Sequence, residues 1–207
     1  MSTAAGYIVF EGGDGAGKTT QIEALAQWLR AQGRTVLLTR EPGGTDLGRQ
    51  IRELVLHGDH VDPRAEALLF AADRAHHIAT LVRPALERAE IVLQDRFLDS
   101  SIAYQGQGRD LVPDEIRGLS MWATRELLPE LTVVLDVDPV LGRARRGDVH
   151  DRLEREADDF HARVREQFLA MAQAAPERYL VLDASLPRDE LAAAIRARVA
   201  PLIGASA

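Results

Sequence analysis

Residues 12–19 read Gly12-Gly13-Asp14-Gly15-Ala16-Gly17-Lys18-Thr19 and fill every fixed position of the phosphate-binding pattern G-x-x-x-x-G-K-[ST]. An apolar run of strand length precedes them at residues 7–10, and a helical pattern begins at Lys18. An ordinary glycine-rich turn is the alternative, but it does not require this order of strand, turn and helix. The stretch therefore predicts a nucleotide phosphate site.

The residue types in this loop suit an anion. Glycines let backbone N–H groups converge on a phosphate without a side chain in the way, and the helix N-terminus adds about half a positive charge. The Lys18 ammonium would reach the outer phosphates, and the Thr19 hydroxyl would coordinate Mg²⁺. We therefore expect nucleotide phosphates and Mg²⁺ along residues 12–19.

Length and composition exclude several classes of protein. The 207 residues, 46% hydrophobic and 28% charged, suit one soluble α/β domain with a sizeable core. The formal net charge of −7 argues against a nucleic-acid surface, and the lack of cysteine excludes disulfides and thiol chemistry. No apolar run is long enough to span a membrane, and residues 1–6 carry no secretion signal. We expect a single cytoplasmic domain over residues 1–207.

Strands and helices alternate along the chain. Continuous apolar runs, typical of parallel strands buried on both faces, occupy residues 7–11, 35–39, 90–94, 131–137 and 179–182. Helical patterns occupy residues 19–32, 46–57, 62–88, 113–128, 154–174 and 188–202, and Pro84 is a candidate for a bend in the third. This alternation predicts an α/β fold, a three-layer doubly wound parallel sheet of five strands.

Ligands of such sheets bind beyond the carboxyl ends of the strands, so residues that follow each strand are candidates for the site. Asp95 stands where P-loop enzymes place the carboxylate that supports Mg²⁺, and the planar fork of Arg96 suits phosphate oxygens. A structural ion pair is the alternative for these two residues alone. The phosphate loop upstream favours the functional interpretation.

A cluster of arginines follows the fourth strand, at Arg143, Arg145, Arg146 and Arg152. Such a charge run, taken alone, is typical of a solvated face. Phosphoryl transfer, however, needs cations around the transferred group, and a mobile segment can supply them when it closes. We therefore predict a mobile lid at about residues 143–155.

The third helix carries two further candidates. Phe70 and Arg74 stand four residues apart and so share a face, although an aromatic residue there is more often part of the core. His76 and His77 are adjacent and lie on different faces, so they do not form a metal pair. We expect both histidines on a solvated helix surface.

Together these stretches resemble the thymidylate kinase family, which phosphorylates dTMP to dTDP with ATP. The matching sequences are FEGGDGAGKTT (10–20), TREPGGT (39–45), LLFAADR (68–74), QDRFLDSSIAYQGQG (94–108) and RARRGDVHDRLE (143–154). Many families share the phosphate loop, whereas TREPGGT together with the 94–108 sequence is far more specific. The resemblance implies a P-loop kinase fold, ATP and Mg²⁺, a role in dTTP synthesis and a homodimer. It also suggests a cis peptide before Pro42.

The resemblance implies a role for each site residue. Residues 12–19 would bind the ATP phosphates, with Arg143 on the same side, and Thr19 and Asp95 would support Mg²⁺. Arg96 would bridge the donor and acceptor phosphates. The acceptor dTMP would be bound by Asp14 at the 3′-hydroxyl, Phe70 and Arg74 at thymine, Ser101 at the base edge, Tyr104 at the 2′ position, and Gln105.

The family places its cations in two ways: in one, the phosphate loop carries a basic residue, and in the other it carries glycine and relies on a lid arginine. Gly15 puts this chain in the second group. Arg146 is our first choice for the catalytic lid residue, and Arg145 is the alternative.

The phosphate loop is also compatible with two other functions. A nucleoside monophosphate kinase that acts on AMP, GMP or UMP would share the phosphate loop. A nucleotide switch or partition ATPase would bind a nucleotide without a small acceptor, but the chain lacks the Asn-Lys-x-Asp guanine reader of GTP switches. It also has Gly12, Gly13 and Asp14 where partition ATPases carry an extra lysine.

Overall fold

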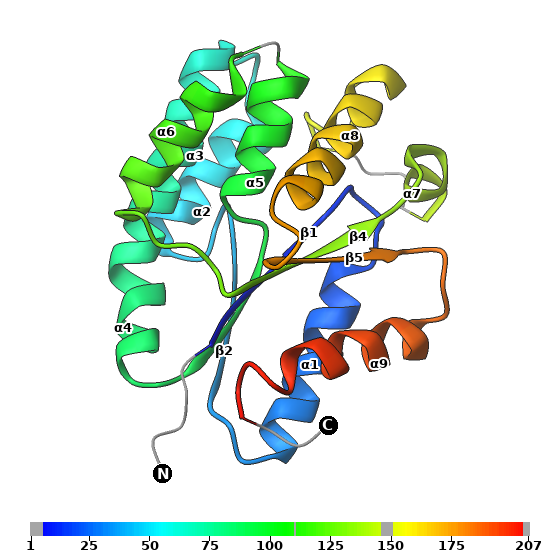
Figure 1. Cartoon of the computed structure of the whole chain (residues 1–207). Helices are drawn as coiled ribbons and strands as arrows, with labels where there is room; N and C mark the ends of the chain where they lie inside the picture. The colour runs from blue at the N-terminus through cyan, green and yellow to red at the C-terminus, as the bar shows by residue number, and fades with distance from the viewer. Residues whose placement is uncertain (1–5, 110, 146–150, 205–207) are drawn as a thin grey trace.

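The computed structural model describes residues 6–109, 111–145 and 151–204. Its centre is a sheet of five parallel strands in the order β2-β3-β1-β4-β5 (Figure 1). The strands are β1 (Gly6–Glu11), β2 (Val36–Arg40), β3 (Ile91–Asp95), β4 (Leu131–Asp136) and β5 (Tyr179–Asp183). Each lies within one residue of the apolar run that predicted it, and the doubly wound α/β fold is confirmed.

Strand β1 shows why these runs are continuously apolar. Tyr7 and Val9 belong to one buried cluster, whereas Ile8 and Phe10 belong to a second cluster on the other face of the sheet. None of the four is more than 1% exposed. Helices α1 (Lys18–Ala31) and α9 (Arg188–Val199) cover the second cluster and lie together below the sheet in Figure 1.

The other face is covered by more helices. They are α2 (Asp46–Arg52), α3 (Pro63–His77), α4 (Arg83–Glu87), α5 (Leu98–Ser101), α6 (Pro113–Thr124) and α8 (Asp158–Ala174). Wider π-helical segments continue three of these helices: η1 (Glu53–His57), η2 (Ile78–Val82) and η3 (Ile102–Gly108). A short helix, α7 (Pro139–Arg145), follows β4.

Several helices differ from the sequence prediction. Helix α6 ends before residue 128 because Arg125 and Glu126 take left-handed backbone angles, with φ of 50° and 59°. Helix α8 begins at Asp158 and not at 154, because turns occupy the residues just before it. Helices α5 and α7 and the segment η3 were not predicted. The peptide bond between Glu41 and Pro42 is cis, as predicted.

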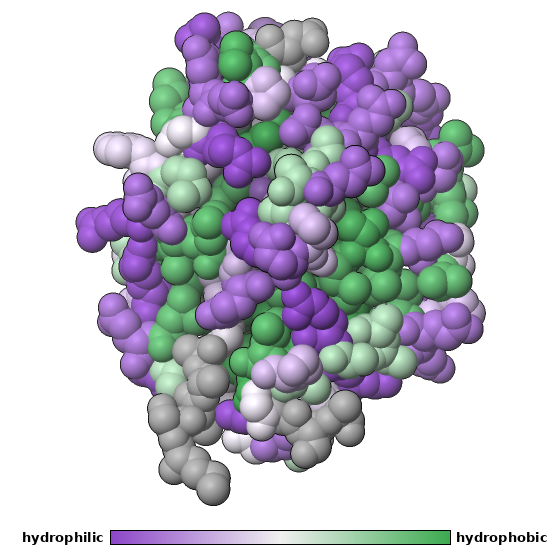
Figure 2. All heavy atoms as spheres, in the orientation of Figure 1, coloured by the Kyte–Doolittle hydropathy of each residue, from purple (hydrophilic) through white to green (hydrophobic). Residues whose placement is uncertain are grey.

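Polar and apolar side chains both reach the surface (Figure 2). On the face drawn in Figure 2, hydrophilic side chains cover much of the helices. Hydrophobic side chains are exposed between them near the β5 edge of the sheet. Val181 of β5, for example, is 42% exposed. No helix within the described ranges is long and apolar enough to cross a lipid bilayer.

Candidate active site

A cleft of about 750 Å³ opens beside the phosphate loop, at the carboxyl ends of β2 and β3. It gathers residues that are far apart in the sequence. The predicted site residues that line it are Asp14, Gly15, Ala16, Gly17, Lys18, Thr19, Phe70, Arg74, Asp95, Arg96, Ser101, Tyr104, Gln105 and Arg145. Gly12 and Gly13 lie at the base of the loop, where their carbonyl groups contact Lys18.

The phosphate loop depends on its glycines. Gly17, just before α1, has φ of 92°, and Gly12 has φ of 127°, both in the region that disfavours other residues. A Cβ atom on Gly12 would lie 2.3 Å from the carbonyl oxygen of Leu135, so the loop passes directly against β4. The sequence G-x-x-x-x-G-K-T thus has a steric reason as well as a chemical one.

Lys18 is the central cation of the loop. Its Nζ donates hydrogen bonds of 3.0 Å to the carbonyl oxygens of Gly12 and Gly13, so the ammonium is folded over the loop. Burial lowers the pKa of Lys18, and the nearby Arg96 guanidinium lowers it further, while the carboxylates of Asp95 and Asp14 oppose this. An anion in the loop would relieve the repulsion between the two cations.

Arg96 is fixed from several sides. Its guanidinium forms an ion pair with Asp14, donates to the Ser100 hydroxyl at 3.2 Å, and lies 5.1 Å from the centre of the Tyr104 ring. Its backbone is left-handed, with φ of 64°, an unusual conformation for a residue other than glycine. The Tyr104 hydroxyl donates to the other Asp14 oxygen at 3.2 Å. This group links the phosphate loop to η3.

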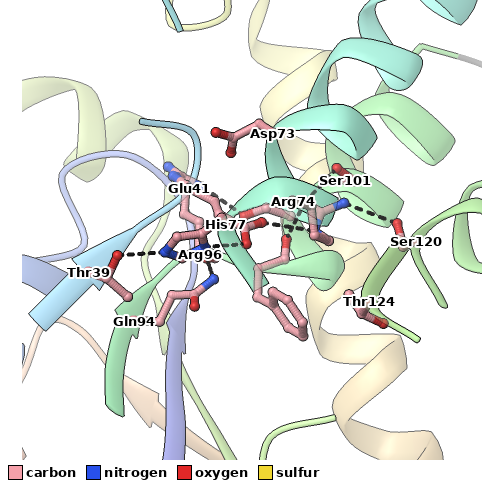
Figure 3. Close-up of polar contacts among 12 residues, drawn as sticks. Thr39, Glu41, Asp73, Arg74, His77, Gln94, Arg96, Ser101, Ser120 and Thr124 are labelled. Atoms are coloured by element: carbon pink, nitrogen blue, oxygen red, sulfur yellow. Dashed lines mark hydrogen bonds and ion pairs between the residues drawn. The ribbon is translucent and has the colours of Figure 1, made fainter. Parts of the chain in front are cut away.

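The pocket next to this group contains an aromatic ring and a buried guanidinium. Phe70 and Arg74 line it from α3, with Ser101 at the end of α5. Arg74 is only 2% exposed and donates from Nη2 to the Ser101 hydroxyl and to the Phe97 carbonyl, both at 3.1 Å (Figure 3). Such a pocket can hold a flat ring and offer it a hydrogen-bond donor.

Not every predicted residue lies in the cleft. Arg143 does not line it, and the guanidinium of Arg143 instead pairs with Asp158. Arg145 does line it and donates to the Ala184 carbonyl at 2.9 Å. Arg146 lies outside the described residues.

Comparisons with known proteins agree with this geometry. The family model described as "Thymidylate kinase" matches residues 10–195. A thymidylate kinase of Clavibacter sepedonicus is 60% identical over 97% of both chains, and one of Leifsonia xyli subsp. xyli is 61% identical over 93% of both. The crystal structure of thymidylate kinase from Ehrlichia chaffeensis has a TM-score of 0.74 and 35% identity, covering 86% of this chain and 93% of that one.

The chain belongs to the thymidylate kinase family. It is therefore a nucleoside monophosphate kinase, a phosphotransferase, and phosphorylation of dTMP is the activity for which this family is named. The resemblance found in the sequence and the P-loop kinase fold are both confirmed. The family also implies a nucleotide as phosphoryl donor.

Phosphoryl transfer from a nucleotide generally involves Mg²⁺, and the residues present fit this ion. The Oδ1 atom of Asp95 is buried and accepts no hydrogen bond from the described residues, although Asp95 lines the cleft together with Thr19. Carboxylate and hydroxyl oxygens are the hard ligands that Mg²⁺ prefers. Within the described ranges no three acidic, histidine or cysteine side chains form a complete metal cage. Mg²⁺ bound to nucleotide phosphates needs only one or two protein ligands.

Two arginines of the cleft were given no role from the sequence, although the segment that follows the second strand, with Arg40, was expected at the cleft. Arg40, at the end of β2, and Arg52, at the end of α2, both line the cleft. Arg52 donates to the Pro42 carbonyl at 3.1 Å, and burial together with the Arg40 charge lowers its pKa. The position of Arg40 after a strand was a usable signal. No sequence signal of this kind identifies Arg52, because its position at the cleft depends on how α2 packs.

A buried carboxylate supports Gln105, which lines the cleft. Glu66 of α3 is fully buried and accepts hydrogen bonds from Gln105, at 2.9 Å, and from Arg152. Arg152 also donates from Nε to the Val55 carbonyl at 2.9 Å. The end of the predicted lid segment is thus attached to α3 and η1, a contact that a charge run in the sequence does not reveal.

His77 corrects another expectation. It is fully buried at the end of α3, where its ring contacts Glu41 and Thr39, so the prediction of a solvated surface is wrong for this residue. The neighbouring His76 is half-buried. The face of α3 that carries His77 packs against the segment that follows β2, and a single helix pattern could not indicate this.

Proposed function

We propose that this kinase transfers the γ-phosphoryl group of ATP, bound as its Mg²⁺ complex, to dTMP and so forms dTDP for dTTP synthesis. The observation that carries the proposal is the joining of two half-sites in one cleft. A phosphate loop with Lys18 lies on one side, and a pocket with Phe70 and Arg74 lies on the other. The fixed pair of Arg96 and Asp14 stands between them.

The two substrates would bind on either side of that pair. Residues 12–19 would hold the ATP phosphates, with Thr19 and Asp95 supporting Mg²⁺, which would add positive charge between the phosphates. The dTMP pocket would use Phe70 to stack on thymine, Arg74 to donate to O4, and Asp14 to accept from the 3′-hydroxyl. Ser101 and Gln105 would border the base, and Tyr104 would crowd the 2′ position and favour deoxyribose.

The proposed reaction is an in-line displacement. A phosphate oxygen of dTMP forms a bond to the γ-phosphorus, and the bond from that phosphorus to the β-bridging oxygen breaks, so that ADP leaves. Charge would spread over the transferred oxygens, and the Arg96 guanidinium and the Lys18 ammonium would neutralise it; the contacts that already hold both groups support this role. Little rearrangement of Arg96 is needed because Ser100 and Tyr104 already fix its guanidinium.

We include the arginine-rich segment in the proposal as a lid at about residues 143–155 of a single kinase domain. Arg146 is the first choice for a cation that reaches the transferred phosphoryl group, and Arg145 is the alternative. Arg143 would act on the ATP side. The neutral Gly15 supports this assignment, because the loop itself offers only Lys18 as a cation.

A substrate panel tests the proposal. ADP release is measured with ATP–Mg²⁺ and, in turn, dTMP, dUMP, ribothymidine monophosphate, dGMP, dAMP, AMP, GMP and UMP. We expect dTMP to give the highest kcat/KM and the ribonucleotide analogue to be disfavoured. A preference for AMP, GMP or UMP would assign another kinase activity. Hydrolysis that needs no monophosphate would favour a nucleotide switch.

We further propose that the enzyme acts as a homodimer in the cytoplasm. Three large apolar side chains are exposed on neighbouring elements: Leu54 on η1 (57%), Leu68 on α3 (59%) and Trp122 on α6 (79%). Exposed apolar side chains of this kind are suited to contact with a second copy of the chain. Light scattering should give twice the mass of 22.7 kDa, and Leu68→Glu or Trp122→Glu should halve it. Val181→Glu, on the sheet edge, is the control.

A further inference from the structure

Three hydrogen bonds, two of them fully buried, form a continuous chain between the end of β2 and α3 (Figure 3). The Thr39 hydroxyl contacts His77 Nε2 at 2.6 Å, and His77 Nδ1 contacts Glu41 Oε1 at 2.8 Å. Arg74 Nε donates to the second Glu41 oxygen at 2.8 Å. The chain therefore ends on a guanidinium that lines the nucleotide cleft.

The orientation of that guanidinium is fixed at all three nitrogens. In addition to the Glu41 contact, Nη1 donates to the Ser120 hydroxyl, and Nη2 donates to Ser101 and to the Phe97 carbonyl, each at 3.1 Å. A guanidinium has five N–H donors. Four of them have acceptors among the described residues, which leaves one Nη1 proton for a ligand.

Glu41 supplies the charge that this arrangement requires. The side chains of Arg74 and Glu41 are each 2% exposed, and a buried guanidinium without a carboxylate partner is strongly unfavourable. The carboxylate divides its two oxygens between Arg74 and His77, so His77 prevents it from rotating away. The ring of His77 is closely confined, since a Cβ atom on Gly44 would lie 2.6 Å from Nε2.

A simple core contact between β2 and α3 would explain the burial of His77 and Glu41. It would not explain why the chain of bonds ends on a residue of the cleft, nor why one N–H of Arg74 has no acceptor among the described residues. Both features are those of a group held ready for a ligand.

We infer that Glu41 and His77 are positioning residues that hold the Arg74 guanidinium with one N–H donor directed at the base of the acceptor nucleotide. A fixed donor favours a pyrimidine with a carbonyl oxygen at position 4, as in dTMP, over one with an amino group there, as in dCMP. With dCMP two donors would face one another, and neither could be satisfied. The inference rests on the proposed function.

The test uses graded changes in this chain of bonds. His77→Leu removes both ring contacts, whereas His77→Asn places an amide nitrogen near the position of Nδ1 and can still donate to Glu41. Glu41→Gln keeps the shape and removes the charge. His76→Leu, at the half-buried neighbouring position, is the matched control. Each variant is assayed with dTMP and dCMP at saturating ATP–Mg²⁺, and its thermal unfolding is recorded.

We expect His77→Leu and Glu41→Gln to raise the KM for dTMP about tenfold and to lower the ratio of kcat/KM for dTMP over dCMP at least about tenfold. The KM for ATP should not change. His77→Asn should retain most of the wild-type ratio of kcat/KM for dTMP over dCMP, and His76→Leu should have the wild-type KM and ratio. Should His77→Leu not fold, Glu41→Gln and His77→Asn still decide the matter.

A purely structural role gives a different result. If the role is purely structural, the variants have a lower melting temperature, but the KM for dTMP and the ratio of kcat/KM for dTMP over dCMP stay at wild-type values. That outcome overturns the inference. A wild-type enzyme that phosphorylates dCMP as well as dTMP overturns it too, while the proposed function stands. A wild-type enzyme that does not phosphorylate dTMP overturns both.

Discussion

Gly15 of the phosphate loop and Gly142 of α7 pack backbone against backbone. A Cβ atom on Gly15 would lie 2.2 Å from the Gly142 carbonyl oxygen, and a Cβ atom on Gly142 would lie 2.5 Å from that of Asp14. Gly15 also has φ of 78°. The loop therefore carries glycine at this position for a steric reason, and α7 rests directly on the loop.

This contact predicts that Gly15 cannot be replaced without loss. Gly15→Ala should lower the free energy of unfolding by about 1–3 kcal/mol, from left-handed strain and the clash with α7. Gly15→Arg, although it adds a cation, should lose activity because α7 must move. Gly118→Ala is the control, since a Cβ atom there meets nothing within 4 Å and should stabilise α6 by up to about 1 kcal/mol. Urea unfolding measures all three, and equal stability of Gly15→Ala and wild type would contradict the steric argument.

The strands could be predicted from sequence because both faces of the sheet are buried, which makes each strand a continuous apolar run. The ends of the helices could not. Arg125 and Glu126 stop α6 through left-handed backbone angles that nothing in a helical pattern indicates. The π-helical segment η3, which carries Tyr104 and Gln105, also lacks the regular spacing by which an α-helix is recognised.

The residues of the cleft were predictable where a motif or a strand end marks them, as at Lys18 and Arg96. The supporting contacts were not, because they join segments that only the fold brings together. Glu41 reaches Arg74 across 33 positions, and Glu66 reaches Arg152 across 86. A sequence pattern identifies the side chain that meets the ligand more readily than the one that holds it.

Lys18→Ala should abolish most phosphoryl transfer and leave the fold intact. In the proposed reaction the ammonium would supply charge at the transferred phosphoryl group, and such electrostatic contributions are worth about 3–4 kcal/mol, or roughly 10²–10³ in rate. Circular dichroism checks the fold and steady-state kinetics checks kcat. A variant that keeps more than about a tenth of wild-type turnover would exclude this role.

Lys18 is also the only lysine of the chain, which permits a chemical test of its position. An amine-directed acylating reagent should inactivate the enzyme in step with modification of one side chain. ATP should protect it, because the nucleotide would cover Nζ in the loop. Peptide mass spectrometry separates this event from reaction at the N-terminal amine. Inactivation that ATP does not slow would place Lys18 away from the nucleotide.

Glu11 at the end of β1 should make stability depend on pH. Its carboxyl is buried and accepts hydrogen bonds from the Phe97 and Ser100 backbone amides, at 2.8 and 3.1 Å. Burial, aided by the charge of Asp99, raises the pKa of Glu11 from 4.5 to about 8. In that range the folded protein binds a proton that the unfolded chain has lost, so stability falls as the pH rises.

Glu11→Gln mimics the protonated acid and should remove this contribution. The stability of the variant relative to wild type should therefore increase by about 1.4 kcal/mol per pH unit between the two pKa values and level off above about pH 8. Urea unfolding of both proteins over this range provides the measurement. Parallel curves would mean that Glu11 has the same pKa in the folded and unfolded states.

The lid arginines should contribute to catalysis and not merely to substrate affinity. Arg145 is held by the Ala184 carbonyl in the structure, so we expect Arg145→Ala to have the smaller effect and Arg146→Ala the larger. A contact made only in the transition state lowers kcat and kcat/KM together, whereas a uniform binding contact mainly raises KM. Arginine fingers raise the rate of phosphoryl transfer by roughly 10³–10⁵. A lid arginine that shares the stabilisation of charge with Arg96 should contribute a factor near or below the lower end of this range.

Steady-state kinetics of both single variants and the double variant, with the exposed Arg155→Ala as control, measures this contribution. We expect Arg146→Ala to lower kcat strongly with little change in the KM for dTMP, and the double variant to be at least as impaired. If all three keep near-native kcat, the segment only covers the cleft. The charge on the transferred phosphoryl group would then be neutralised by Lys18, Arg96 and the metal alone.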